Sequence, residues 1–193
     1  MEDAIKPRLV VGITGASGAI YGIRLLERLR ELDVETHLIV TSWARVTIEH
    51  ETSYTLAQVK ALADVTYGEG DQAAAVSSGS FLTHGMIVAP CSTKTLAAIA
   101  NGFGHNLVAR AADVVLKERR RLVLAVRESP LSAVHLRNML TLSEMGVSIC
   151  PPVPAFYSLP KSLDDVVDQT VVRILDPFDF NVPTSARWTG LGS

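Results

Sequence analysis

The sequence has little that would support a role outside the cell, in a membrane or on nucleic acid. Its 193 residues include only two cysteines, too few for a disulfide scaffold. The first residues, "MEDAIKPR", are acidic where a secretory signal would be basic and then apolar, and no apolar run approaches the roughly 18 residues of a membrane-spanning helix. Eighteen Lys and Arg residues nearly balance 20 Asp and Glu residues, so the overall charge favours neither nucleic acid nor an anionic membrane surface. We therefore expect a reduced, cytoplasmic protein in which any anion site is local.

Patterns typical of zinc, nucleophile and ATP chemistry are also missing. The five histidines show no H-x-x-x-H or H-E-x-x-H spacing, so no zinc site is expected. Cys91, in "APCST", is the only candidate nucleophile, and because no histidine has an evident pairing with it, a buried cysteine at the end of a strand is the favoured interpretation. The motif G-x-x-x-x-G-K-[ST] is absent, which argues against an ATP-binding P-loop.

One acidic motif has the spacing of a magnesium site. Asp164, Asp165 and Asp168, in "DDVVD", match the D-D-x-x-D pattern by which some polyprenyl-diphosphate enzymes bind magnesium. The motif directly follows Ser162, however, and a serine there is a good helix cap, with first-turn carboxylates interacting favourably with the helix dipole. We therefore predict the start of a helix and no metal at this motif.

The sequence does contain an alternation of short apolar strands and amphipathic helices, which is typical of a parallel sheet covered on both faces. The predicted class is α/β: a single-domain, doubly wound, Rossmann- or flavodoxin-like fold over residues 1–193, with a mostly parallel sheet and an irregular tail at 177–193. Strands are expected at residues 8–14, 35–41, 85–90, 121–127 and 146–152. Helices are expected at residues 20–32, 42–51, 93–102, 106–120, 132–146 and 162–176.

The residues that follow the predicted strands are candidates for one shared site, because a doubly wound sheet binds ligands at the carboxyl ends of its strands. They are small residues, hydroxyl residues and one charged pair: Gly15, Ala16, Ser17, Gly18, Thr41, Ser42, Cys91, Ser92, Thr93, Arg127, Glu128 and Ser129. Glycines allow a close approach of the backbone, and a helix amino terminus supplies N–H groups, so the first turn, "GITGASGAIYG", can hold a phosphate. A tight strand–helix turn without a ligand is the alternative.

The pattern of this turn favours a mononucleotide over a dinucleotide. Gly12, Gly15 and Gly18 do not form G-x-G-x-x-G, and Thr41 and Ser42 stand where a dinucleotide fold places a ribose-binding Asp or Glu. Hydroxyl groups suit a phosphate oxygen better than a ribose diol, so the sequence favours FMN over NAD.

Several segments, in order along residues 8–190, carry a resemblance to a known family: "TGASGAIYG", "PCSTKTLA", "RAADVVLKERR", "VRESPLSAVHLRNML", "PPVPAFYSLP" and the terminal "RW". Together they resemble the UbiX/Pad-type flavin prenyltransferases, within the wider group of flavin-binding, decarboxylase-like Rossmann proteins. The resemblance implies a metal-independent transfer of the allyl group of dimethylallyl monophosphate to reduced FMN. It also implies that the product, prenylated FMN, serves a UbiD-type aromatic acid decarboxylase, and that subunits form trimers that combine into a homododecamer with the flavin at subunit boundaries.

Such a transfer requires a cationic clamp for the departing phosphate and an aromatic or flavin face for the allyl cation. The resemblance implies phosphate binding by Lys117, Arg127, Tyr157 and Arg173. It implies catalytic roles for Ser17, Glu51, Glu128, Lys117 and Trp188. It implies flavin binding by Gly15, Ala16, Ser17, Thr41, Ser92, Thr93 and Arg127, and Lys94 adds a positive charge near the flavin turn.

Each of these roles has a simpler structural alternative. Ser17 can cap the following helix, and Arg127 and Glu128 can form a plain ion pair. Lys117 can belong to a solvated basic cluster at a helix end, and Arg173 can be a surface arginine with a buried stem. Two other functions also stay open. One is an FMN-dependent decarboxylase acting on peptidyl or small-molecule cysteine, although those proteins carry a P-A-S-A-N-T-like segment where this chain has "PCSTKT"; the other is a non-catalytic flavin carrier subunit of a hydroxyarylic acid decarboxylase.

Overall fold

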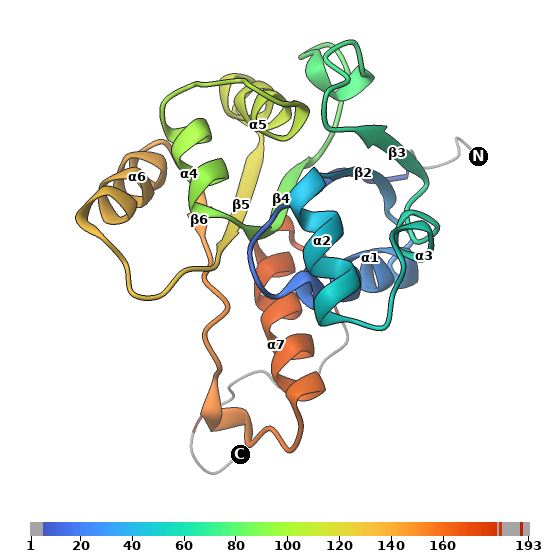
Figure 1. The fold of residues 1–193 in the computed structure, drawn as a ribbon, viewed down its shortest axis with the longest axis vertical. Helices are drawn as coiled ribbons and strands as arrows, with labels where there is room; N and C mark the ends of the chain where they lie inside the picture. The colour runs from blue at the N-terminus through green and yellow to red at the C-terminus, as the bar shows by residue number, and fades with distance from the viewer. Residues whose placement is uncertain (1–5, 181, 183–189, 191–193) are drawn as a thin grey trace.

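The chain folds around a parallel sheet, whose strands lie side by side across the centre of Figure 1. The structure, a computed structural model, describes residues 6–180, 182 and 190. Within them the sheet has six parallel strands in the order β3-β2-β1-β4-β5-β6. The strands are β1 (Arg8–Ile13), β2 (Glu35–Val40), β3 (Val65–Gly68), β4 (Gly85–Cys91), β5 (Arg121–Val126) and β6 (Ser148–Ile149). This is the strand order of a Rossmann sheet, which reverses between β1 and β4, and the predicted fold class is confirmed.

Helices connect the strands and cover both faces of the sheet. They are α1 (Ala19–Glu31), α2 (Ser42–Glu51), α3 (Leu56–Lys60), α4 (Thr93–Ala100), α5 (Leu107–Lys117), α6 (Ala133–Glu144) and α7 (Leu163–Leu175), with short 3-10 turns η1 (Ala75–Ser77), η2 (Phe156–Ser158) and η3 (Asp176–Phe178). One buried cluster joins the sheet to α1, α7 and the inner side of α2, and a second joins it to α4, α5 and Leu142 of α6. Because both faces are covered, strands such as β4 are buried along their whole length.

The structure contains two elements that were not predicted from the sequence, and one predicted strand is shorter than expected. The edge strand β3 and the short helix α3 were not predicted, because β3 has four residues that alternate between half-buried and exposed and therefore lacks an apolar run. The strand expected at 146–152 is only Ser148–Ile149, since Pro151 and Pro152 have no N–H to donate to a neighbouring strand.

The described part of the predicted tail packs on the core. Phe178 and Val182 are buried in the cluster that contains α1 and α7, and Phe180 lies against the same cluster. Among the described helices none is long and apolar enough to cross a bilayer.

Candidate active site

A carboxylate from α2 holds the glycine-rich turn after β1. Gly18, the N-cap of α1, has a left-handed φ of 97° and offers no side chain to the helix. Instead, Oε2 of Glu51 accepts hydrogen bonds from the N–H groups of Gly18 at 2.7 Å and Ala19 at 3.3 Å. A carboxylate in this position satisfies unpaired amides at the helix start and interacts favourably with the helix dipole. The cap that the sequence offered for Ser17 is therefore supplied by Glu51, which lies at the same turn.

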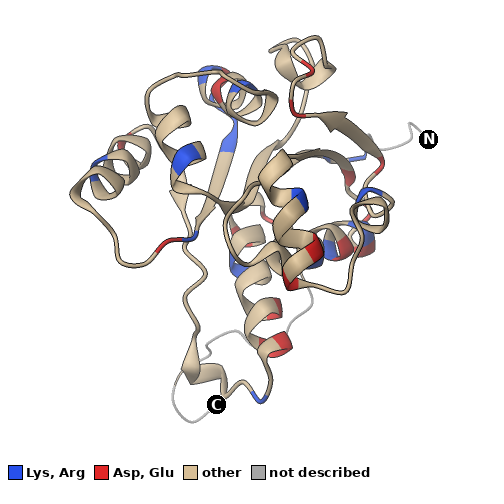
Figure 2. Ribbon diagram, viewed as in Figure 1, with Lys and Arg blue, Asp and Glu red and all other residues tan. Residues whose placement is uncertain are grey.

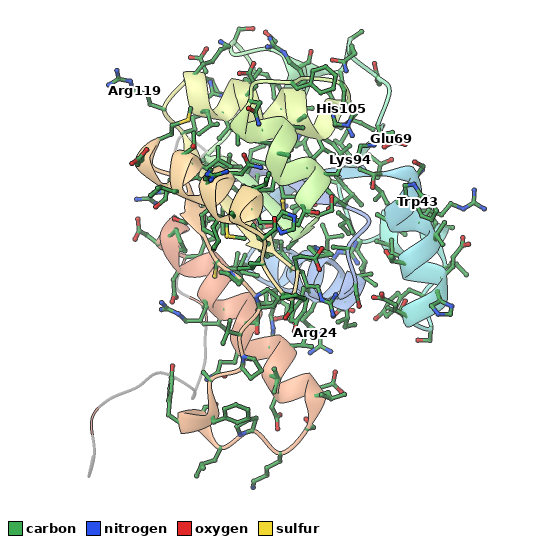
Figure 3. All side chains as sticks on the ribbon, turned by 60° about the vertical axis from the view of Figure 1, so that its left-hand side comes forward. Arg24, Trp43, Glu69, Lys94, His105 and Arg119 are labelled. Carbon is green, nitrogen blue, oxygen red and sulfur yellow. The ribbon has the colours of Figure 1, made fainter. Side chains whose placement is uncertain are left out.

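A small pocket of about 210 Å³ lies at the point where the strand order reverses. We call it the switch-point pocket. Figure 3 shows four of its side chains, from α2, α4 and the loops after β3 and before α5, gathered at one edge of the molecule: Trp43, Glu69, Lys94 and His105. Four predicted flavin-binding residues also line it: Gly15, Thr41, Ser92 and Thr93. Ligands of doubly wound sheets bind in the crevice at this position.

Gly15 allows the turn to lie directly against the start of α2. A Cβ atom at Gly15 would lie 2.4 Å from the Cβ of Trp43, closer than two carbon atoms can approach without a bond. The Trp43 side chain is 68% exposed and forms part of the wall of the switch-point pocket. A residue with a side chain at position 15 would therefore push α2 away and widen the pocket. Ala16, the next residue of the turn, is buried.

The backbone around the switch-point pocket offers hydrogen-bond donors. Thr41 and Ser92 are the N-caps of α2 and α4, so the amino ends of two helices, with their N–H groups and positive dipole ends, meet there. Thr14 fixes the two strand ends, because its Oγ1 donates to the Pro90 carbonyl at 2.8 Å and accepts from the Ser92 N–H at 2.8 Å. The arrangement fits an anion rather than a cation.

Side-chain charges in the switch-point pocket have both signs. The exposed Lys94 lines the pocket from the first turn of α4 and adds a positive charge. The carboxylate of Glu69 also lines it, and its Oε1 accepts the N–H of Ser42 at 3.0 Å, so one first-turn amide of α2 is already used. The remaining donors suit the phosphate end of a mononucleotide. The volume agrees with this fit, because pockets for whole drug-sized ligands usually exceed about 300 Å³.

A larger cleft of about 770 Å³ adjoins the same turn, and we call it the central cleft. Its walls come from the β1–α1 turn, the end of α2, the end of β5, the segment 151–154 and the first turns of α7. Four residues with predicted roles line it together: Ser17, Glu51, Arg127 and Glu128. The fold thus brings together chemistry-bearing residues from three distant parts of the sequence.

Arg127 and Glu128 form hydrogen bonds with different partners. Oε1 of Glu128 accepts the N–H of Ser129 at 2.9 Å, and the backbone N–H of Arg127 donates to the carbonyl of Cys91 at 3.1 Å. The ion pairs found within the described residues do not include one between these two neighbours, so the plain ion pair considered from the sequence is not formed. The charge of Arg127 acts inside the cleft: burial raises the pKa of Tyr21, and the Arg127 guanidinium acts in the opposite direction.

Much of the remaining lining of the central cleft is apolar. Ile20, Val153, Val166 and Val167 line it, and prolines of the segment 151–154 complete this side. The cleft therefore combines one cation, the carboxylates of Glu51, Glu128 and Asp164, and several hydroxyl groups with apolar surface that fits a short hydrocarbon group.

Tyr157 and Arg173 line a different cavity, of about 470 Å³, which we call the side cleft. It is bounded by Cys150, Tyr157, Gln169 and Arg173, and it shares Pro151 and Val153 with the central cleft. The segment around Pro151 therefore separates the two cavities. Arg173 is 65% exposed at its side chain and its Nη1 donates to Oδ2 of Asp176 at 2.5 Å. Two of the four predicted phosphate-binding residues meet here, and a third, Arg127, lies in the central cleft.

Two predicted site residues, Ala16 and Lys117, line none of the three cavities described above. Lys117 ends α5 and forms an ion pair with Glu118, and its Nζ lies close to Gly79. The strand β5 begins just after it, so Lys117 lies at the amino edge of the sheet, opposite the edge that carries Arg127. Trp188 lies outside the described residues.

Comparisons with known proteins agree with this geometry. The Flavoprotein family matches residues 1–175. A probable UbiX-like flavin prenyltransferase of Streptomyces sp. (strain D7) is 61% identical over 185 residues, which are 95% of this chain and 92% of that protein. The chain belongs to the UbiX-like flavin prenyltransferases. The family predicted from the sequence motifs is therefore confirmed.

Two crystal structures extend the match of this flavin prenyltransferase to three dimensions. AnUbiX (PadA1) in complex with FMN and dimethylallyl pyrophosphate has a TM-score of 0.95 and 55% identity, over 96% of this chain and 98% of that one. A dodecameric FMN-dependent UbiX-like decarboxylase from Escherichia coli O157:H7 has a TM-score of 0.93 and 57% identity, over 95% of this chain and all 100% of that one.

The D-D-x-x-D motif of this flavin prenyltransferase has a structural role. Ser162 caps the start of α7, as predicted, and Asp165 completes a capping box with it. Asp164 and Asp168 both bind the guanidinium of Arg24 on α1, at 3.0 and 2.5 Å. Figure 2 shows these acidic residues as red segments on the amino-terminal turns of α7. All three carboxylates are thus used within the fold, and the described residues contain no group of side chains that could hold a metal ion.

Cys91 is the buried strand-end cysteine that the sequence predicted. It is fully buried, and desolvation raises the pKa of its thiol to about 12. Almost no thiolate exists at neutral pH with such a pKa, so Cys91 is unsuited to be a nucleophile.

Some residues that line the cavities were not predicted from the sequence. Tyr21 and Tyr54 line the central cleft, and the Tyr54 hydroxyl donates to Glu27 at 2.7 Å, which raises the pKa of the phenol. Tyr21 follows the flavin turn by one helical turn, so the spacing from Ser17 was a usable signal. No sequence signal indicated Gln169 of the side cleft, because the environment of its side chain depends on packing.

Proposed function

We propose that the chain is a flavin prenyltransferase that joins the dimethylallyl group of dimethylallyl monophosphate to reduced FMN. The observation that carries this proposal is the pair of cavities at one glycine-rich turn. The switch-point pocket offers helix ends and hydroxyls for a flavin phosphate, and the adjoining central cleft gathers Ser17, Glu51, Arg127 and Glu128 together with apolar residues. The match to AnUbiX, whose crystal structure contains FMN and dimethylallyl pyrophosphate, supports FMN and a dimethylallyl phosphate ester as the ligands.

FMN would be held by the residues of the turn and the switch-point pocket. Thr41, Ser92 and Thr93 would bind its phosphate with the amino ends of α2 and α4 and the Lys94 ammonium. Gly15, Ala16 and Ser17 would pass along the flavin, and Arg127 would reach its ring from the central cleft. When bound, reduced FMN supplies the nucleophile that accepts the allyl group.

The residues of the central cleft would bind the prenyl phosphate and move protons. As the C–O bond breaks, the phosphate leaves with the electron pair, and Arg127 would stabilise its growing charge. Glu51 and Glu128 are placed to take up the proton released at the acceptor and to protonate the leaving phosphate, with the Ser17 hydroxyl as a relay. The apolar walls would exclude water from the allyl group. No step needs a metal ion, because the charges of the leaving phosphate are met by side chains.

We infer that the complete site is built from more than one copy of the chain. Within one subunit the four predicted phosphate-binding residues lie apart. Arg127 lines the central cleft, Tyr157 and Arg173 line the side cleft, and Lys117 lies at the far edge of the sheet. An assembly in which neighbouring copies supply the missing groups to each central cleft would reunite them. A homododecamer, as in the similar protein from Escherichia coli O157:H7, is the proposed assembly.

The proposed product, prenylated FMN, would serve a UbiD-type aromatic acid decarboxylase as its cofactor. This recipient, the cytoplasmic location and the role of Trp188 stay predictions from the sequence. The second candidate function is an FMN-dependent decarboxylase or a flavin carrier subunit, which the name of the similar Escherichia coli protein, a UbiX-like decarboxylase, keeps open.

An anaerobic incubation tests the proposal. The purified protein is mixed with reduced FMN and dimethylallyl monophosphate, and in parallel with the diphosphate, and the released flavin is analysed by mass spectrometry. We expect a flavin heavier by one prenyl unit, and the two parallel reactions show which of the two phosphates is the better substrate. Unmodified FMN from a protein that binds both ligands would refute transfer and leave the decarboxylase or carrier function.

A further inference from the structure

The side cleft contains a buried amide group without a partner. Gln169, on α7, is only 6% exposed, and its Nε2 has no hydrogen-bond partner among the described residues. In the part of the chain that the structure describes, Thr83 Oγ1 is the other buried side-chain atom without a hydrogen-bond partner, and it does not line the side cleft. A buried N–H group without an acceptor is unfavourable, and in folded proteins such a group usually has a functional or ligand-related reason.

Gln169 lies at the same cavity as two of the predicted phosphate-binding residues, Tyr157 and Arg173. Gln169 and Arg173 are four residues apart on α7, so they lie on one face of the helix, one above the other. Both line the side cleft, and Tyr157 of η2 lines it from the other wall. The buried Gln169 is part of the interior wall, and the exposed Arg173 is near the mouth.

The polar groups of the side cleft favour an anion. Arg173 carries a guanidinium with five N–H donors, of which one is given to Asp176, and Tyr157 has a phenolic hydroxyl. The hydroxyl of Thr170, which also lines the cleft, donates to the Val166 carbonyl at 2.8 Å. The amide N–H groups of Gln169 add a donor that carries no charge. Among these groups, an oxygen-rich anion is the ligand that satisfies the amide and the guanidinium together.

We propose that Gln169 is a further substrate-binding residue, which donates a hydrogen bond from Nε2 to a phosphate oxygen of the prenyl phosphate. This inference rests on the proposed function, and it adds a neutral donor to a phosphate site otherwise made of Lys, Arg and Tyr. In the assembly, the side cleft of one copy would supply Tyr157, Gln169 and Arg173 to the substrate as one unit.

The proposal predicts opposite effects on stability and on substrate binding. Gln169→Leu has nearly the same size and removes the unpaired amide, so the thermal midpoint of the ligand-free protein should stay the same or rise. The same change removes a hydrogen bond to a charged oxygen, so the KM for dimethylallyl monophosphate should rise roughly ten- to hundredfold, with kcat little changed. Gln169→Glu places a negative charge near the phosphate and should raise KM further. FMN affinity should not change, because the flavin residues lie in another pocket.

Three measurements test this on the whole assembled protein: prenylation kinetics, phosphate titration and thermal unfolding. Steady-state prenylation gives KM and kcat for the wild type, Gln169→Leu, Gln169→Glu and the control Gln72→Leu, which changes an exposed glutamine far along the sequence. Isothermal titration with inorganic phosphate measures anion binding without turnover.

An unchanged KM and phosphate affinity in both Gln169 variants would overturn the proposal, while wild-type prenylation would still support the enzyme function. If the wild type does not prenylate, the proposed function fails, and phosphate titration still decides whether Gln169 binds an anion. A fall in the thermal midpoint of Gln169→Leu with unchanged phosphate binding would also overturn it, because the amide would then be structural.

Discussion

At the scale of single residues, Glu51 has two separable tasks. It accepts the first N–H groups of α1, and it lines the central cleft, where the proposed function gives it a proton-transfer role. Glu51→Gln keeps an acceptor oxygen but removes the charge, so we expect a loss of about 0.5 kcal/mol of unfolding free energy from the weaker interaction with the helix dipole. Glu51→Ala removes the cap and should cost about 1–2 kcal/mol. Urea unfolding at pH 7 measures both.

The same two variants separate the structural task from the chemical one. If Glu51 transfers a proton, Glu51→Gln should lower kcat for prenylation about as much as Glu51→Ala, although it is the more stable of the two. Activity that follows stability, with Glu51→Gln nearly as active as the wild type, would show that the carboxylate serves only as the cap of α1.

The residues of the flavin site were more predictable than those of the phosphate site. Thr41 and Ser92 meet at the switch-point pocket because parallel strands bring their carboxyl ends to one edge, which follows from the strand pattern alone. Tyr157 and Arg173 lie on elements outside the sheet, so the strand pattern did not indicate them and their predicted role came from the resemblance. Gln169 could not be predicted, because whether a helical glutamine finds a partner is decided by packing.

At the scale of elements, Arg24 joins α1 to α7. Its guanidinium binds Asp164, Asp168 and Glu27, and its side chain is only 20% exposed. The first turns of α7 form one wall of the central cleft, so this cluster fixes a wall of the proposed site. The D-D-x-x-D spacing that resembles a magnesium motif thus serves to position a helix.

We expect Arg24→Met to loosen α7 without removing the apolar stem of the side chain. The loss should be about 1–2 kcal/mol of unfolding free energy, because the pairs are partly buried, and it should shrink in high salt. The KM for prenyl phosphate should rise while FMN affinity is kept, since the switch-point pocket does not contact α7. Arg45→Met is the matched control: its pair with Glu49 is largely exposed, so the change should stay below about 0.5 kcal/mol. Equal losses in both variants would contradict a special role for the Arg24 cluster.

Element boundaries were predictable where the sequence had strong end signals. The helix at 42–51 was predicted with the bounds that the structure has, because Thr41 is an N-cap that directly follows a buried strand. The strand β3 was missed because an exposed edge strand of four residues has no apolar run, and its pairing with β2 is a property of the fold rather than of the segment.

At the scale of the whole molecule, one subunit cannot bring the predicted phosphate-binding residues together. Lys117 lies at the amino edge of the sheet and Arg127 at the carboxyl edge, with β5 between them. A strand of this length spans about 20 Å, farther than a lysine side chain reaches. The resemblance named the residues, but which copy of the chain supplies each one depends on the assembly, which no local pattern encodes.

Mixing two inactive variants tests this arrangement. Lys117→Ala and Arg173→Ala should each lose most prenyl phosphate use and keep FMN binding. If the two residues of one site come from different copies, oligomers assembled from an equal mixture should contain intact sites, and about a quarter of wild-type activity should return. A mixture of Tyr157→Ala and Arg173→Ala is the control and should regain nothing, because these residues line the side cleft of the same copy. Native mass spectrometry verifies that mixed oligomers have formed. Mixed oligomers of the first pair that stay inactive would show that Lys117 and Arg173 do not act from different copies, and the composite site would have to be abandoned.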